Sequence, residues 1–431
     1  LVAKVKEEPS QGSRPYHPPT WKQRLEGHLD PLITEQVPEG VTSDTWVHFS
    51  NIVREQMFPS NREAMKFAKT QYERLMAYKN SLEENHLAKS PDYQMLLLSL
   101  QRDDFLYMDS EARMSQSLLR NRIVAAVLKG GDQSYHLGGG VGGLETLQLQ
   151  DDDIDKVFGD LESMLKAEKL KPGRYKVLMA PAITGVFAHE AFGHSQEADT
   201  WARNRSKARE LYESQEKVGN EHATILNNPA IYKNGTDDFA AWGSYFFDEE
   251  GWLAQEQYLV KEGRLQPPMT NLTSALRLGV PRTANGKRES WSHAIYSRQT
   301  NTYFSAGTST FKELMEQMDY GFLARNCNGG MEDPKGMGIQ VGMAFIEEVK
   351  NGQLTGRTFK APNGGAVQLT GYVPDYLNSI LGKSKIEAFS DQPDKEQHPW
   401  NEVGGCGKYH KELVNAGCGG TYILVDNCLL G

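Results

Sequence analysis

This sequence has little cysteine, no long hydrophobic run and no excess of basic residues. It contains 4 cysteines in 431 residues and no C-x-x-C pair, which excludes a disulfide framework as the source of stability. The longest apolar run, residues 95–100, is far shorter than the roughly 18 residues that suggest a membrane-spanning helix. Acidic residues outnumber basic ones by 56 to 47, whereas nucleic-acid binding typically needs a basic patch. We therefore expect neither a membrane nor a nucleic acid as a partner.

The start of the chain shows no signal-peptide pattern, which predicts a cytoplasmic protein. The first residue is Leu1 rather than methionine, so a signal sequence removed before Leu1 remains an open alternative. With 39% hydrophobic residues, a chain of this length has enough material for a large core and for two or three domains.

The first 170 residues are expected to form a lead-in and one domain. Residues 1–40 are rich in proline and poor in apolar periodicity, which predicts an extended lead-in. Residues 41–170 are expected to form an N-terminal α/β domain. Its expected elements are a helix that begins at the capping box of Ser60 and Glu63, strands at 104–109 and 117–128 around a polar turn, a flexible glycine-rich connection at 138–143, and a helix at 153–169.

Residues 171–431 are expected to form a C-terminal metallopeptidase-like domain, mostly of antiparallel strands. The patterns predict a strand at 176–179, a helix from 182 to about 211, hairpins at 260–265 and 345–354, a helix at 310–320 and a strand at 422–429. Asn351-Gly352 suits the type I′ turn of the second hairpin. The predicted class is α+β: a helix-containing N-terminal domain and a mostly antiparallel C-terminal domain that carries a distorted metal-binding helix.

The main chemical signal is the segment His189-Glu190-Ala191-Phe192-Gly193-His194. Zinc peptidases of the H-E-x-x-H type place two histidines at i and i+4, about 40° apart around a helix, so both rings reach one ion. Here the second histidine is at i+5, about 140° away on a regular helix. If both bind one ion, the helix needs a π-bulge or a break, and Gly193 is a residue type that permits such a distortion.

Three blocks of residues make the chain similar to the TldD/PmbA family of metallopeptidases. They cover roughly residues 171–431 and occur in the family order, which makes them more specific than the histidine motif alone. The blocks are Pro172-Gly173-Arg174-Tyr175 with the histidine motif, residues 286–293 followed by residues 298–303, and Gly404-Gly405-Cys406-Gly407-Lys408.

The resemblance implies a metal ion held by His189, His194 and Cys406, with Glu190 as the general base. It implies the motif-bearing, TldD-like member of the family, which acts on unfolded peptides. It also implies a dimer that encloses the site, either a homodimer or a heterodimer with a paralogue that lacks the motif. Cys418 also lies in a glycine-rich loop and is chemically suitable, but only Cys406 lies in the C-G-K block that the family uses.

The chemistry of these side chains agrees with the resemblance. Two imidazoles and a thiolate are good Zn²⁺ ligands, and three protein ligands leave a fourth position open, as in catalytic zinc sites. His293 and Arg288 are candidates for holding a developing oxyanion, although an ordinary hydrogen-bonded pair explains them nearly as well. Glu197 and Asp199 either orient a histidine ligand or form the solvated face of the helix, and we favour the solvated face.

Two other functions remain open. The chain could be a non-catalytic regulatory or binding partner with a structural metal, in which case Cys418 or His410 supplies a fourth ligand. It could also be a metal-dependent amidohydrolase of a modified small peptide. We expect a metallopeptidase of the H-E-x-x-x-H type that binds one Zn²⁺ per active subunit.

Overall fold

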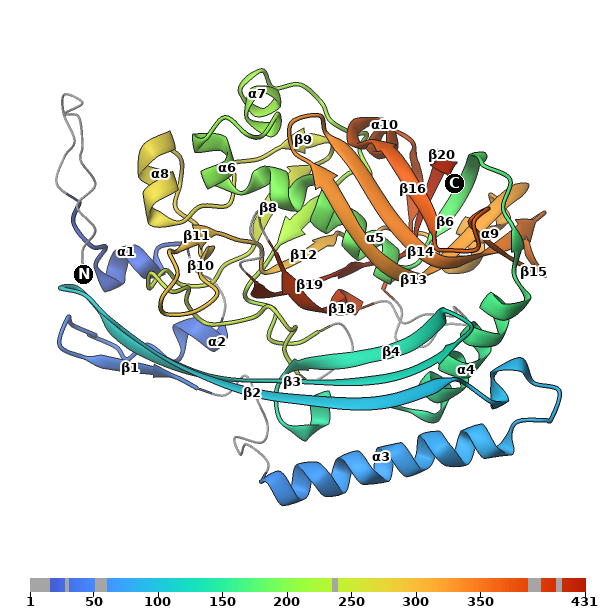
Figure 1. Cartoon of the computed structure of the whole chain (residues 1–431). Helices are drawn as coiled ribbons and strands as arrows, with labels where there is room; N and C mark the ends of the chain where they lie inside the picture. Colours follow the sequence, from blue (N-terminus) through green and yellow to red (C-terminus); the bar gives the residue numbers. More distant parts are fainter. Residues whose placement is uncertain (1–15, 28–30, 51–59, 235–238, 387–396, 408–412) are drawn as a thin grey trace.

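A computed structural model describes residues 16–27, 31–50, 60–234, 239–386, 397–407 and 413–431. A long curved sheet and the helix α3 form the lower part of the molecule in Figure 1, and the two larger sheets lie above them. The α+β class is therefore correct. No helix in the described ranges has the length and apolar character needed to cross a membrane.

The lower sheet consists of β1 (Trp46–Phe49), β2 (Tyr93–Met108), β3 (Arg113–Lys129) and β4 (Asp132–Val141). Strands β2 and β3 pair antiparallel from Tyr93–Leu128 to Met108–Arg113, which confirms the two strands and the polar turn between them. The predicted start of the first strand, residue 104, is wrong, because β2 begins at Tyr93. The flexible connection predicted at 138–143 is wrong, because residues 138–141 belong to β4. A Cβ atom on Gly140 would lie 2.6 Å from the carbonyl oxygen of Ala240. This glycine therefore allows the backbone at Ala240 to pass close to β4, and it does not make the segment flexible.

Two helices cover this sheet, and both begin at a capping box. Helix α3 (Asn61–Ser81) starts at Ser60, whose side chain accepts from the Glu63 N–H while the Glu63 side chain accepts from the Ser60 N–H, as predicted. Helix α4 (Asp151–Lys166) begins and ends slightly earlier than predicted. Leu75 of α3, Phe158 of α4 and strand residues such as Ile123 form one buried cluster.

The expected extended lead-in contains two short helices, α1 (Trp21–Leu25) and α2 (Pro31–Thr34). The Thr20 side chain caps α1, and Trp21 is buried in the same cluster as Phe246. The burial of the Trp21 indole ring therefore stabilises a helical turn here, which the proline content of the segment did not predict. Residues 1–15 of the lead-in lie outside the described residues.

The upper body contains two larger sheets. The first has the strand order β13 (Tyr320–Asp333), β6 (Gly173–Met179), β20 (Ile423–Leu430), β16 (Val367–Tyr372), β14 (Gly338–Lys350), β15 (Gln353–Lys360) and β5 (Glu168–Lys169), with β17 (Ile380–Lys383) beside β20. The second has the order β18 (Gln397–Cys406), β19 (Val414–Gly420), β12 (Asn301–Phe304), β7 (Ile225–Asn227), β8 (Gln257–Lys261) and β9 (Arg264–Leu265). Most pairings are antiparallel; β13–β6, β15–β5 and β12–β19 are parallel.

Both predicted hairpins are confirmed as β8–β9 and β14–β15. Asn351 and Gly352 both have positive φ, 51° and 75°, as a type I′ turn requires. The predicted strand at 422–429 corresponds to β20. The remaining elements are β10 (Gly286–Lys287), β11 (Tyr296–Ser297), α6 (Ala198–Ala202), α7 (Ala208–Glu213), α8 (Leu272–Leu278), α9 (Phe311–Glu316) and α10 (Val373–Asn378).

Helix α5 (Pro181–Ala188) contacts strands of both upper sheets, including β13 and β14 of the first and β12, β18 and β19 of the second. Its approach to β19 is close, since a Cβ atom on Gly185 would lie 2.4 Å from the Gly419 nitrogen. The end of α5 is therefore held by rigid elements on both sides. The predicted domain limits near residues 40 and 170 remain a prediction.

A carboxylate pair, the buried Asp248 and the half-buried Glu250, joins the loops near the lower sheet. Asp248 accepts hydrogen bonds from the N–H groups of Glu250, Trp252 and Gly286. Glu250 accepts one from the Leu272 N–H. Burial, followed by the charge of Asp248, raises the pKa of Glu250 to about 7.

This raised pKa predicts a pH-dependent contribution to stability. The folded protein binds the proton on Glu250 more tightly than the unfolded chain, whose glutamates titrate near 4.5. The contribution is complete below that value and is lost as the pH rises through about 7. In denaturant unfolding at pH 8, we expect Glu250→Gln to raise the free energy of unfolding by on the order of 1 kcal/mol. The exposed-site control Glu73→Gln should change it little, and an unchanged pH profile in Glu250→Gln would contradict the assignment.

Candidate metal centre

The histidine motif lies where α5 changes its winding. Residues His189–Gly193 form a π-helix, and the His194 N–H donates to the His189 carbonyl five residues earlier. A 3₁₀ turn at His194–Gln196 follows. The predicted distortion is confirmed.

The predicted continuation of this helix to about residue 211 is wrong. Glu197 is extended, with φ −75° and ψ 113°, and the chain resumes in the short helices α6 and α7. The Met269 N–H donates to the Gln196 carbonyl, and the Ala198 N–H donates to the Met269 carbonyl. A strand-like bridge to a distant segment therefore replaces the helical hydrogen bonds at this point.

Gly193 is needed for space rather than for an unusual backbone conformation. Its φ of −60° is ordinary for a helix. A Cβ atom there would lie 1.9 Å from Oε1 of Gln299. The Gln299 side chain is buried against the π-turn and donates from Nε2 to the His189 carbonyl at 3.3 Å. The glycine therefore lets a neighbouring segment support the wide turn.

The structure brings together His189, His194 and Cys406. Their potential ligand atoms all lie within 4.8 Å of one another. The two imidazole centroids are 4.8 Å apart with ring planes at 87°, and Cys406 Sγ lies 3.5 Å from His194 Nε2. Cys406 ends β18 and is buried, so the thiol reaches the site from the second upper sheet.

The charges of this group favour a thiolate at Cys406 and a protonated imidazole at His194, so a metal ion that binds here must displace the histidine proton. Burial alone would raise the pKa of the Cys406 thiol, but His194, His189 and Arg298 hold it well below its ordinary value. Burial alone would lower the pKa of His194, and the negative charges of Cys406 and Glu197 raise it. A thiolate beside two imidazoles is a donor set that fits Zn²⁺.

Glu190 is buried beside these groups. Burial raises its pKa to about 7, and a hydrogen bond with Glu332 adds to the effect, whereas both motif histidines oppose it. Glu190, His194 and Glu332 form a second group of potential ligand atoms within 4.8 Å. Strand β13 approaches closely here, since a Cβ atom on Gly330 would lie 2.7 Å from Glu190 Cγ. Glu332 had no recognisable signal in the sequence, because it lies far from the motif along the chain.

The favoured interpretation of Glu197 and Asp199 as a solvated face is wrong. The exposed fractions are 0% for Glu197 and 9% for Asp199. Glu197 Oε2 lies 3.2 Å from His194 Nδ1, and its other oxygen lies 3.3 Å from Nε of Arg298. Arg298 belongs to one of the family-like blocks, and that block was the available signal for its importance.

The other expected site residues have different partners. Arg288 forms an ion pair with Glu249, and exposed His293 lies 2.8 Å from Ser290 Oγ and near Glu289. No interaction of the described residues joins either side chain to the motif histidines or to Cys406. Their expected role in holding an oxyanion remains a prediction without support from contacts.

The alternative ligands differ from Cys406 in position. Cys418 is buried in β19 opposite Thr302, and Cys327 is buried in β13. Neither belongs to a group of potential metal ligands in the described part of the chain. His410 lies outside the described residues.

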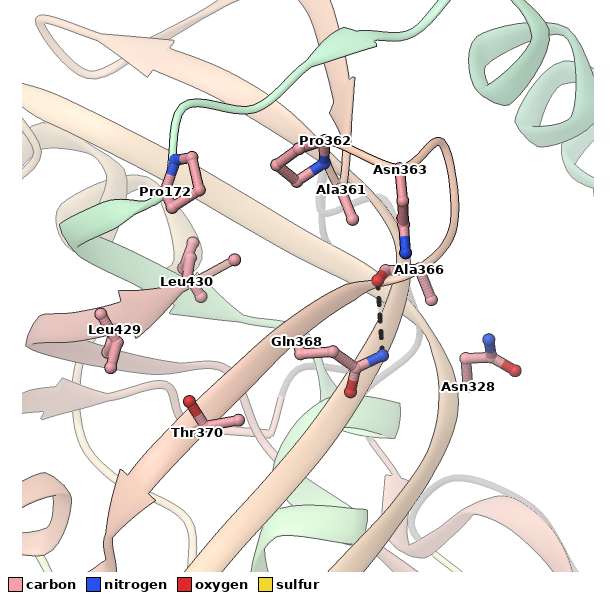
Figure 2. Close-up of a pocket in the computed structure, with 11 residues that line it drawn as sticks. Pro172, Asn328, Ala361, Pro362, Asn363, Ala366, Gln368, Thr370, Leu429 and Leu430 are labelled. Atoms are coloured by element: carbon pink, nitrogen blue, oxygen red, sulfur yellow. Dashed lines mark hydrogen bonds between the residues drawn. The ribbon is translucent and has the colours of Figure 1, made fainter.

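A separate open pocket of about 790 Å³ lies beside β16 and β20. Figure 2 shows its polar side chains Asn328, Asn363, Gln368 and Thr370 among prolines, alanines and leucines, with Gln368 bonded to the Ala366 carbonyl. The pocket lining contains no imidazole, thiol or carboxylate side chain. Among the described residues, imidazole, thiol and carboxylate groups come together at the end of α5, so the motif is the candidate active site.

The fold and the donor set define a class: an α+β protein with a candidate His-His-Cys centre on a π-helix. The sequence model of a family described as the PmbA/TldA metallopeptidase C-terminal domain matches residues 172–428. The chain belongs to this TldD/PmbA family.

Relatives and solved structures agree with this assignment. The chain is 30% identical over 298 residues to a metalloprotease of Methanothermobacter thermautotrophicus, covering 68% of this chain and 58% of the relative. It is 29% identical over 224 residues to a zinc metalloprotease TldD homolog of Saccharolobus solfataricus, covering 49% and 48%. The chain thus spans about half the length of these relatives. The crystal structure of TldE from Thermococcus kodakarensis has a TM-score of 0.60 at 12% identity, covering 88% of this chain and 77% of that one, which shows a shared fold.

The geometry predicts which cysteine binds the metal. Cys406→Ser should lose most bound zinc in elemental analysis, because the hydroxyl is a much poorer ligand than the thiolate it replaces. Cys418→Ser is the matched control, a buried cysteine in the adjacent strand, and should retain its zinc. Equal loss in both variants would contradict the assignment and indicate a four-ligand structural site.

Proposed function

We propose that this chain is a zinc-dependent peptidase in which His189, His194 and Cys406 hold the metal and Glu190 is the general base. The observation that carries this proposal is the convergence of the three donor side chains beside the buried carboxyl of Glu190. Three protein donors leave a fourth position open, which is typical of catalytic rather than structural zinc. The relatives named as metalloproteases support the same activity.

The proposed mechanism assigns the proton transfers to Glu190. When bound, Zn²⁺ supplies Lewis-acid activation of water and of the scissile carbonyl. Glu190 takes a proton from the attacking water and then delivers it to the leaving amine, so the C–N bond breaks with a neutral amine as the product. The position of Glu190 next to His189 and within reach of His194 places a proton acceptor beside the proposed metal.

The surroundings of Glu190 hold its carboxyl group in place. The hydrogen bond to Glu332 and the close approach of Gly330 restrict the side chain from the β13 side. Preorganisation of a general base in this way removes the cost of ordering it during the reaction.

We also propose that the substrate is an unfolded peptide and that a homodimer, or a heterodimer with a motif-lacking paralogue, encloses the site. The family resemblance supports this proposal. A folded substrate cannot present an extended backbone to an enclosed centre. Solution scattering should give twice 48.3 kDa for a homodimer, or 48.3 kDa plus the mass of the paralogue for a heterodimer. A monomer that cleaves folded proteins efficiently would contradict the enclosure.

The substitution Glu190→Gln tests the proposed base. The amide keeps the shape of the side chain but cannot accept the proton, so hydrolysis of an unfolded fluorogenic peptide should fall by at least roughly 10²-fold. Zinc content should stay near that of the parent, because Glu190 is not one of the three proposed ligands. The exposed control Glu210→Gln should leave both quantities unchanged.

The outcomes separate the alternatives. Retained turnover in Glu190→Gln at equal zinc loading excludes Glu190 as the base. A parent protein that binds zinc but hydrolyses no peptide favours the regulatory or binding function. Hydrolysis limited to a small modified peptide favours the amidohydrolase function.

A further inference from the structure

Four buried side chains, two of them proposed metal ligands, form a closed ring of contacts. Arg298 Nη2 donates to Cys406 Sγ at 3.3 Å, and Cys406 Sγ lies 3.5 Å from His194 Nε2. His194 Nδ1 lies 3.2 Å from Glu197 Oε2, and Glu197 Oε1 accepts from Arg298 Nε at 3.3 Å. The ring joins three chain segments that are far apart in the sequence.

The guanidinium group of Arg298 closes this ring, because its Nη2 and Nε atoms bond two different side chains. Nη2 also donates to the Cys406 carbonyl at 2.6 Å, so Arg298 holds both the backbone and the thiol of that residue, while Nε faces Glu197. The exposed fractions are 1% for Arg298 and 0% for Glu197. Burying such charges is costly unless each has close partners. The ring supplies those partners.

We propose that Arg298 is a positioning residue that holds Cys406 against His194 and, through Glu197, orients the His194 ring for metal binding. The inference rests on the proposed function and adds a residue that touches neither the metal nor the substrate. Groups that orient metal ligands typically contribute 10–100-fold to metal affinity. Lysine cannot reproduce the role, because a single ammonium group lacks the planar fork that reaches Cys406 and Glu197 together.

Arg298→Met and Arg298→Lys test the proposal through metal binding. We expect the Zn²⁺ dissociation constant, measured by competition with a chromophoric chelator, to rise about 10–100-fold in both variants. In protein loaded with Co²⁺, the thiolate-to-cobalt charge-transfer band should weaken or shift, because Cys406 is no longer held in place. A purely structural arginine would lower stability without changing this band. Arg298→Lys with the parent's affinity and spectrum would overturn the proposal, since charge alone would then suffice.

Two controls sharpen the test. Arg325→Met removes another buried arginine, one that pairs with Asp160 and Glu347, and should leave the cobalt spectrum unchanged. In a double-mutant cycle, Glu197→Gln and Arg298→Met should be clearly non-additive in metal affinity, because they break the same ring. Additive effects would mean that the two residues act independently and would overturn the positioning role.

A metal-free measurement separates this proposal from the proposed function. A parent protein that binds neither Zn²⁺ nor Co²⁺ contradicts the proposed function. The positioning role is then decided by a crystal structure of metal-free Arg298→Met. We expect Cys406 Sγ to leave its 3.5 Å contact with His194 Nε2, and retention of that contact would overturn the proposal.

Discussion

The hydrogen bond from the His194 N–H to the His189 carbonyl is the constraint on which the candidate site depends. With regular α-helical winding, the two rings would point about 140° apart. The π-turn inserts one residue and brings the ring centroids to 4.8 Å. Such turns are rare and frequently lie at functional sites. Here Gln299 bonds the His189 carbonyl in the space that Gly193 leaves open.

The same turn depends on the position of α5 between the two upper sheets. Strand β6 leads directly into the helix, β19 passes against Gly185, and β18, the neighbour of β19 in the same sheet, ends in Cys406. The proposed donors and Glu190 therefore lie on or directly beside helices and strands rather than on long loops. Rigid elements hold a constellation of side chains more accurately than loops do, and a metal centre needs that accuracy.

The buried polar groups around the centre depend on one another as interaction partners. Cys406, His194, Glu197 and Arg298 are all nearly inaccessible to solvent, so each would be costly to bury alone. Each lies against the next, and the pKa values of Cys406 and His194 shift in the directions that favour opposite charges. Removal of one member leaves the others buried with an incomplete set of partners. The arrangement is therefore stable only when it is complete.

Local sequence signals determined a large part of this structure. The Ser60–Glu63 capping box placed the start of α3, Asn351-Gly352 placed a type I′ turn, and the i+5 spacing of the histidines required a distorted helix. In each case the residues that make the decisive hydrogen bonds or backbone angles are neighbours in the chain. The block around Cys406 suggested the third donor through family resemblance.

Only the tertiary structure decided the features that depend on distant segments. The glycines at 138–140 form part of a strand because other backbone passes close to them, and the motif helix ends because Met269 bonds on both sides of Glu197. Contacts between distant segments also bury Glu197, place Arg298 in the ring and bring Glu332 to Glu190. The sequence by itself determined which chemical groups are available and how the chain winds locally. The packing of two sheets around α5 decided which of those groups meet, because burial and contact are properties of segments far apart in the chain.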